Sequence, residues 1–161
     1  MKTKTIQIYT FDELSEDIQE KVISNYRNDD EFFYGSDYVK TLEVFCEHFN
    51  IKLLDYSLGD SRYNNIKIDW DYIPNKTTLM VSKKWMETCP LTGCCYDIDI
   101  LEPLTKSFKG KTSEEVLQEC FDSLIDAYMK ELEYWESRES IIDDIQTNNH
   151  YFTIDGEITM E

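Results

Sequence analysis

The 161-residue sequence has little glycine, little proline and few basic residues. It contains 5 glycines and 3 prolines, and its 16 lysines and arginines face 33 aspartates and glutamates. So few glycines and prolines argue against long linkers, and no low-complexity run or internal repeat is present. No apolar run approaches the roughly 18 residues that a membrane-spanning helix needs. Residues 1–10 alternate polar and apolar side chains and lack the apolar segment of a signal peptide. We therefore expect a cytosolic protein that does not bind a membrane.

The cysteines are odd in number and no secretion signal precedes them. Such a set is typical of reduced, cytosolic thiols rather than of a disulfide framework. The five cysteines are Cys46, Cys89, Cys94, Cys95 and Cys120.

The sequence nevertheless has enough apolar surface to fold. Hydrophobic residues make up 41% of the chain and aromatic residues 14%, which argues against intrinsic disorder despite the high net charge. The length fits one domain. We predict a single acidic α+β domain that covers residues 1–161.

The negative charge is concentrated in two regions. Residues 12–37 hold nine acids and two bases, for a net charge of −7, and residues 113–145 hold eleven acids and two bases, for −9. Residues 38–112 hold ten of each and are neutral, while the whole chain has a formal net charge of −17. A uniformly acidic surface would not leave a neutral middle.

Hydrophobic periodicity predicts helices that pack on an antiparallel sheet. We expect an N-terminal strand at 3–9, a three-strand meander in the middle of the chain, and a C-terminal hairpin around the Asp155-Gly156 pair. The meander strands are predicted at 51–58, 65–72 and 77–81, and the helices at about 12–27, 37–49, 97–108 and 113–136, the last continuing or restarting toward 145.

The predicted helix at 113–136 has opposed apolar and acidic faces. Thr112 and Glu115 match a capping box at its start. At about 100° per residue, five acids fall within about 40° of one line, opposite an apolar stripe. Like charges at this spacing cost a few tenths of a kcal/mol per pair, so a helix selected for stability alone would carry more lysine. The acids are Glu115, Glu119, Asp122, Asp126 and Glu133, and the stripe is Leu117, Cys120, Phe121, Leu124, Tyr128 and Trp135.

A second candidate surface lies in the loop between the first two predicted helices. Aromatic rings beside acids suit recognition, because the rings supply contact area and the acids steer a basic partner. The alternative is that the rings complete the core, just as a solvated face is the alternative for the long helix. Phe32 lies within this loop and Tyr38 follows it. The candidate partner-binding residues of the loop are Asp29, Asp30, Glu31, Phe33 and Tyr34.

Chemistry-bearing motifs are sparse. Cys89 and Cys94 have the spacing of a zinc-ligand pair, but no second pair follows, and neither histidine sits in a nucleophile signature. Asp69 and Asp71 could hold a divalent cation weakly, although solvated carboxylates are the simpler reading. We predict no catalytic residue, no metal ligand and no cofactor, and the repulsion between phosphates and this surface argues against direct nucleic-acid binding.

Three segments resemble small acidic proteins encoded by phages and prophages of Firmicutes, most of them uncharacterised. These segments are TFDELSEDIQEKVISNYR at 10–27, CPLTG at 89–93 and DIDILEPL at 97–104. The resemblance implies an accessory protein of a mobile element that acts in the host cytosol. Small acidic proteins of that origin often inhibit host defence nucleases, as anti-CRISPR or anti-restriction proteins do, some by mimicking DNA.

The charge map and the resemblance together lead to one main hypothesis. We expect a phage-derived inhibitor, not an enzyme, that binds the basic nucleic-acid-binding surface of a host nuclease or effector. Two alternatives stay open. One is a small metal-dependent enzyme or regulator centred on residues 89–99, and the other is a structural or regulatory phage protein that works as a homodimer or larger oligomer.

Overall fold

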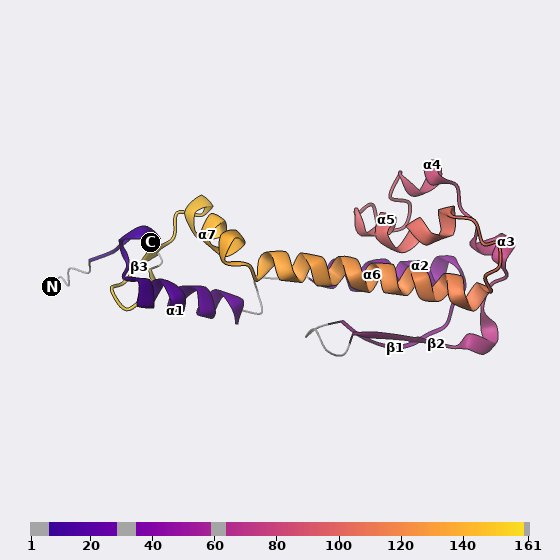
Figure 1. Ribbon diagram of the computed structural model, residues 1–161, viewed down its shortest axis with the longest axis horizontal. Coiled ribbons are helices and arrows are strands. Elements are labelled where there is room, and N and C mark those ends of the chain that lie inside the picture. The colour runs from indigo at the N-terminus through magenta and orange to yellow at the C-terminus, as the bar shows by residue number, and fades with distance from the viewer. Residues whose placement is uncertain (1–6, 29–34, 59–63, 160–161) are drawn as a thin grey trace, which may run out of the picture. The chain divides into compact units, whose positions relative to one another are not determined.

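The computed structural model describes residues 7–28, 35–58 and 64–159. It confirms the α+β class, because helices predominate and two small two-stranded sheets accompany them (Figure 1). The chain divides into two compact units. We call residues 1–33 together with 132–161 the terminal unit, and residues 34–131 the middle unit.

The terminal unit packs two helices from opposite ends of the sequence against each other. α1 and α7 are in contact, and the 3-10 helix η1 contacts α7. The elements are η1 (Phe11–Glu13), α1 (Glu16–Arg27), α7 (Arg138–Thr147), β3 (Tyr151–Phe152) and β4 (Ile158–Thr159). The core consists of Phe11, Leu14, Val22, Ile23, Tyr26, Ile141, Ile145 and Phe152.

The predicted first helix is interrupted at its start. Glu13 Oε2 accepts a hydrogen bond from the backbone N–H of Thr10 at 2.8 Å, and this capping interaction belongs to η1 rather than to α1. Leu14 and Ser15 then adopt extended backbone conformations before α1 begins. Leu14 is buried, and the extended turn places this side chain in the core of the terminal unit.

The C-terminal hairpin is confirmed, and it depends on Gly156. β3 and β4 pair antiparallel through Tyr151 with Thr159 and Phe152 with Ile158. Gly156 has φ +80°, and a Cβ at this position would lie 3.0 Å from methyl groups of Ile18 and Val22 on α1. Only glycine combines the left-handed backbone with so close an approach to a helix.

The predicted N-terminal strand is described only from residue 7 onward. Tyr9 forms an isolated antiparallel bridge with Phe152, and each residue donates its backbone N–H to the other at 2.8 Å. The remainder of the predicted strand, residues 3–6, lies outside the described residues.

The middle unit is built around most of α6. In Figure 1 the hairpin of β1 and β2 lies on one side of α6, and α4 and α5 lie on the other. α5 contacts both α2 and α4. The elements are α2 (Ser36–His48), β1 (Leu53–Ser57), β2 (Asn65–Ile68), η2 (Trp70–Tyr72), α3 (Lys76–Leu79), α4 (Lys83–Met86), α5 (Tyr96–Leu101), η3 (Glu102–Thr105) and α6 (Ser113–Trp135).

The predicted three-strand meander is wrong: the structure forms only its first hairpin. The chain leaves β2 after Ile68 and turns helical at η2 and again at α3. Asp69 accepts the backbone N–H of Asp71 at 3.3 Å, and Asn75 accepts that of Thr78 at 3.1 Å. Such short-range bonds from Asp and Asn side chains compete with a sheet ladder and favour turns, so the predicted second strand stops at Ile68 and residues 77–81 form no strand.

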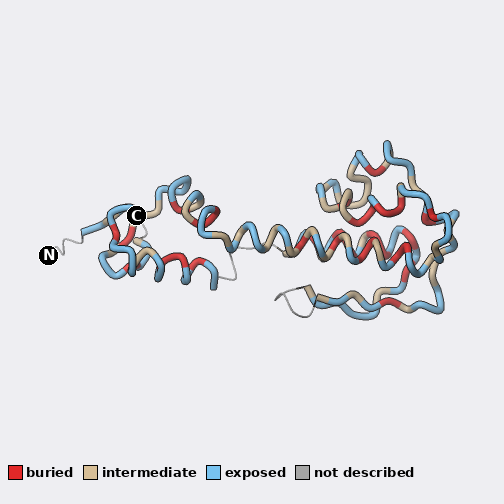
Figure 2. Tube along the Cα trace, in the orientation of Figure 1, coloured by how far each residue is buried: buried red, intermediate tan, exposed pale blue. Residues whose placement is uncertain are grey.

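The long helix matches its prediction closely. α6 ends at Trp135, and a new helix, α7, restarts at Arg138 after Ser137 caps it. The predicted inward residues of α6 up to Tyr128 are buried, together with Val116, whereas Trp135 is only half-buried. Figure 2 shows buried positions in the first two thirds of α6 and none after Tyr128.

Candidate partner-binding surfaces

The two structural units do not coincide with the two acidic regions of the sequence, so the net charge is counted again for each unit. The terminal unit has 16 acidic and 5 basic residues, for a net charge of −11. The middle unit has 17 acidic and 11 basic residues, for −6. The smaller unit therefore carries most of the excess negative charge.

The acids of α1 and α7 face away from the core that these helices share. Relative to buried Val22, the exposed residues Glu16, Asp17 and Glu20 lie between about 120° and 220° around α1. On α7, exposed Glu139 and Asp143 lie about 160° and 200° from buried Ile141. Since the apolar stripes of α1 and α7 meet in one core, the fold brings two acidic faces into one unit.

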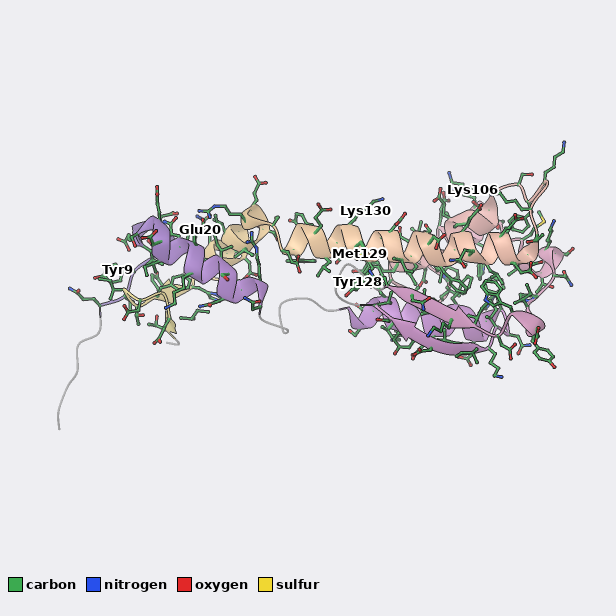
Figure 3. All side chains as sticks on the ribbon, turned by 60° about the horizontal axis from the view of Figure 1, so that its bottom comes forward. Tyr9, Glu20, Lys106, Tyr128, Met129 and Lys130 are labelled. Atoms are coloured by element: carbon green, nitrogen blue, oxygen red, sulfur yellow. The ribbon has the colours of Figure 1, made fainter. Side chains whose placement is uncertain are left out.

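The bases described in the terminal unit already have partners. Lys21 Nζ donates to the backbone carbonyl of Asp155 at 2.8 Å, and Arg27 Nε donates to that of Glu136 at 2.8 Å. Arg138 forms an ion pair with Glu20, which is labelled in Figure 3. These bonds tie α1 to the hairpin turn, to the start of the α6–α7 connection and to α7. Among the described residues of the unit, most acids have no basic side chain as a partner.

The acidic row predicted on α6 is only partly available. Glu115 Oε2 accepts the backbone N–H of Thr112 at 2.6 Å and so caps its own helix. Glu119 forms an ion pair of 2.6 Å with Lys111, and Asp122 accepts a hydrogen bond from Gln118 at 2.8 Å. Asp126 and Glu133 are exposed. The row thus contains acids with helix-stabilising partners, which the helical projection alone does not reveal.

The row is also divided between the units. Glu115, Glu119, Asp122 and Asp126 belong to the middle unit, and Glu133 belongs to the terminal unit. The second predicted surface is not described: Asp29, Asp30, Glu31, Phe33 and Tyr34 lie outside the described residues. Tyr38, at the border of that loop, is 1% exposed and belongs to the core.

The cysteine-containing turn at 89–95 is organised by Asp97. This buried carboxylate accepts backbone N–H groups of the turn, with Oδ2 lying 2.8 Å from Leu91 N, 2.9 Å from Thr92 N and 3.2 Å from Gly93 N. Its Oδ1 accepts the Thr92 hydroxyl at 2.7 Å. Asp97 therefore holds the preceding turn. Such a concave set of N–H groups binds a carboxylate well. Here the carboxylate is that of Asp97 itself, and its role is to stabilise the turn.

The thiols near this turn do not form a metal site. Cys89 and Cys94 are half-buried and Cys95 is exposed. Across the described part of the chain, which includes all five cysteines, no group of three or more His, Cys, Asp or Glu side chains could hold a metal ion. Asp69, one of the paired carboxylates, forms an ion pair with Lys52 at 3.0 Å. The hydrogen bond from Lys52 lowers the pKa of Asp69.

Sequence reasoning missed a carboxylate–tyrosine cluster in the middle unit. Glu131 on α6 accepts the hydroxyl of Tyr38 at 2.6 Å and that of Tyr96 at 3.0 Å. The two tyrosine rings stack with centroids 3.8 Å apart. Burial, chiefly, and the adjacent Glu131 carboxylate raise the pKa of both tyrosines well above the ordinary range. The cluster joins α2, α5 and α6. The sequence shows that the chain is rich in aromatic residues, but no pattern in it indicates that these two tyrosines meet Glu131.

A shallow hollow opens where η2 approaches the start of α6. It is lined by Trp70, Glu114, Glu115 and Gln118. Trp70 is 40% exposed, which is high for an indole ring beside a folded core. The sequence assigned Trp70 to a half-buried strand, so neither the exposure nor the neighbouring glutamates could be anticipated.

The chain matches no protein-family model, no curated protein and no solved structure in the comparisons. The resemblance to phage proteins therefore stays a prediction. Within the described ranges, no helix combines the length and the apolar character that crossing a bilayer requires.

Proposed function

We propose that this protein is a phage-derived inhibitor that binds the basic, nucleic-acid-binding surface of a host defence protein, as anti-CRISPR and anti-restriction proteins do. One observation carries the proposal: α1 and α7, separated by residues 28–137, pack together and turn their acids outward on one unit of net charge −11. The proposal places the main electrostatic surface on the terminal unit, with the exposed acids of α6 contributing as a further surface.

Electrostatics support a basic partner. Concentrated charge of one sign destabilises a compact unit through self-repulsion, and the few bases of the terminal unit offset little of it. A basic partner would relieve this repulsion and would be steered toward the surface, which raises the association rate. Carboxylates on a helix face recur about every 5–6 Å, and two such faces offer a phosphate-like charge pattern to a groove that binds DNA at about 3.4 Å per phosphate on each strand.

A competition experiment tests the proposal directly. Fluorescence anisotropy would follow the binding of labelled duplex DNA to purified host CRISPR effectors and restriction enzymes as the protein is added. The wild-type protein should displace DNA from at least one of them, and more weakly as salt rises above roughly 0.15 M. A terminal-unit variant with Glu16→Lys, Asp17→Lys, Glu139→Lys and Asp143→Lys should lose displacement, because all four residues are exposed and opposite the core.

A matched variant separates this surface from general acidity. Glu43→Lys, Glu47→Lys, Asp122→Lys and Asp126→Lys change the charge by the same amount at exposed positions of the middle unit. Displacement should largely survive in that variant. Equal losses in the two variants, or no displacement from any purified nuclease by wild-type protein, would contradict the proposal. Circular dichroism of both variants verifies that the helices remain folded.

A further inference from the structure

The hollow beside η2 combines an accessible aromatic ring with carboxylates. Trp70 contributes its indole, α6 contributes Glu114, Glu115 and Gln118, and all four belong to the middle unit. The side chain of Glu114 is exposed and makes no hydrogen bond or ion pair with the described residues. Gln118 donates its amide N–H to Asp122, so its carbonyl oxygen is left as an acceptor.

Bonds of a neighbouring residue order the backbone turn that carries the ring. Asp69 accepts the backbone N–H of Asp71 at 3.3 Å and pairs with Lys52 at 3.0 Å. The first bond caps η2, the second ties its start to the residue before β1, and the indole belongs to this short helix. A ring carried by an ordered turn leaves less backbone freedom to be lost when a ligand binds, which favours recognition.

The geometry points to a binding site for an arginine side chain of the basic partner. A guanidinium group stacks on an indole face through cation–π attraction, and its planar set of N–H donors matches carboxylate oxygens and an amide carbonyl. This inference rests on the proposed function only in supposing that the partner is basic. It gives the middle unit an aromatic anchor, which charge alone does not supply.

Other ligand classes fit the hollow less well. An anion at the start of α6 would meet Glu114 and Glu115, and part of the helix end is already occupied, because Thr112 Oγ1 accepts the N–H of Glu115 while Glu115 accepts that of Thr112. A neutral apolar ligand would cover the indole but would make no use of the negative charge of Glu114 beside it. A cation with several donors satisfies both features.

NMR spectroscopy of the full chain provides the test. The chain has 3 tryptophans, so three indole N–H signals are expected and can be assigned with single Trp→Phe variants. The probe is Nα-acetyl-arginine amide, and its neutral isostere Nα-acetyl-citrulline amide is the control ligand. The Trp70 signal should shift saturably with the arginine probe, the signals of Trp85 and Trp135 should move far less, and the citrulline probe should produce little shift.

Variants of single residues isolate the two parts of the hollow. Glu114→Gln should weaken binding of the arginine probe about two- to fivefold, the loss expected for an exposed charge contact. Trp70→Leu, followed through the backbone N–H signals of residues 114–118, should abolish binding. Tyr72→Leu is the matched control, because Tyr72 lies on the same short helix and is 74% exposed but does not line the hollow.

Three outcomes would overturn the inference: a Trp70 signal that shifts no more than the other two, equal binding of the citrulline probe, or tighter binding of Nα-acetyl-lysine amide. The proposed function can fail separately. If the arginine probe binds as expected while the charge-reversed terminal-unit variant still displaces DNA, the arginine site is supported and the proposed function is refuted. If the probe does not bind while that variant loses displacement, the arginine site is refuted and the proposed function is supported.

Discussion

The hydroxyl of Tyr38 donates a 2.6 Å hydrogen bond to Glu131, which joins the first turn of α2 to α6. These residues are 93 positions apart in the chain, and Glu131 is the last residue that α6 gives to the middle unit. A tyrosine hydroxyl is protonated at physiological pH, and burial together with the Glu131 carboxylate raises the pKa of Tyr38 further, so the group acts as a donor. The bond therefore connects the first helix of the middle unit to the last residue of that unit.

Tyr38→Phe should destabilise the protein more than Tyr96→Phe. Tyr38 is 1% exposed and Tyr96 is half-buried, so water can replace the lost hydroxyl more easily at Tyr96. A hydrogen bond to a charged group contributes about 1.5–3 kcal/mol, and the loss at Tyr38 should fall in this range. Urea denaturation monitored by circular dichroism measures both variants. Equal losses would show that the bond to Glu131 is not protected from solvent.

Asp97→Asn should destabilise the middle unit strongly. The amide offers one acceptor oxygen where the carboxylate offers two, and its NH₂ group would face the N–H donors of the turn. Each buried group left unsatisfied costs about 1–3 kcal/mol. Thermal denaturation should therefore show a clear decrease in stability. Glu102→Gln, an exposed acid on the following 3-10 helix, serves as the control and should change stability little; an equally mild effect of Asp97→Asn would contradict the structural role.

Asp99 should make the stability of the protein decrease with rising pH. Burial raises the pKa of Asp99 above its ordinary value of 3.8, with Glu102 adding to the effect. The folded state therefore binds this proton more tightly than the unfolded state does. The corresponding stabilisation is fully present below pH 3.8 and is lost as the pH rises through the raised pKa.

Asp99→Asn should remove this part of the pH dependence. The variant should gain stability relative to wild type as the pH rises, and the difference should level off once Asp99 is ionised in the folded wild-type protein. Denaturant titrations at several pH values from acid to neutral measure it. A difference that stays constant with pH, or one of opposite sign, would show that Asp99 is not desolvated.

Gly156→Ala should be more destabilising than Gly110→Ala. Both glycines have left-handed backbones, with φ +80° and +81°, and alanine in that region costs roughly 1–2 kcal/mol. A Cβ at Gly110 meets nothing within 4 Å, whereas one at Gly156 lies 3.0 Å from methyl groups of Ile18 and Val22. Subtracting the two free energies of unfolding isolates the steric contribution. A difference near zero would indicate that α1 yields to the added methyl group.

Thiol labelling should distinguish the exposed cysteine from the buried ones. Cys95 is exposed, while Cys46 and Cys120 are buried. Burial raises the pKa of Cys46 to about 12 and also raises that of Cys120, so neither thiol forms the reactive thiolate in the folded protein. Iodoacetamide followed by peptide mass spectrometry should modify Cys95 in the folded protein, and Cys46 and Cys120 only after unfolding. Early labelling of Cys120 would contradict the packing of α6.

Local sequence signals predicted the long elements well. The capping pair Thr112 and Glu115 and the apolar stripe up to Tyr128 located α6 almost to the residue, because helix start signals and a 3.6-residue period reinforce each other over many turns. The Asp155-Gly156 pair identified the C-terminal hairpin for a similar reason, since the turn requires a glycine. The third meander strand was mispredicted because Asp69 and Asn75 make short-range bonds that outweigh an alternating pattern over a few residues.

For the candidate sites too, one part follows from the sequence and another part only from the tertiary structure. The sequence by itself determined how much negative charge the chain carries and which helix faces hold it. It also determined that the 16 basic residues are too few to neutralise the 33 acidic ones. Only the tertiary structure decided where those faces meet: α1 and α7 come together because their apolar stripes share one core. Tyr38 bonds to Glu131, and Trp70 and Glu114 line one hollow, for the same physical reason, since the meeting of residues distant in the chain depends on packing that no local pattern encodes.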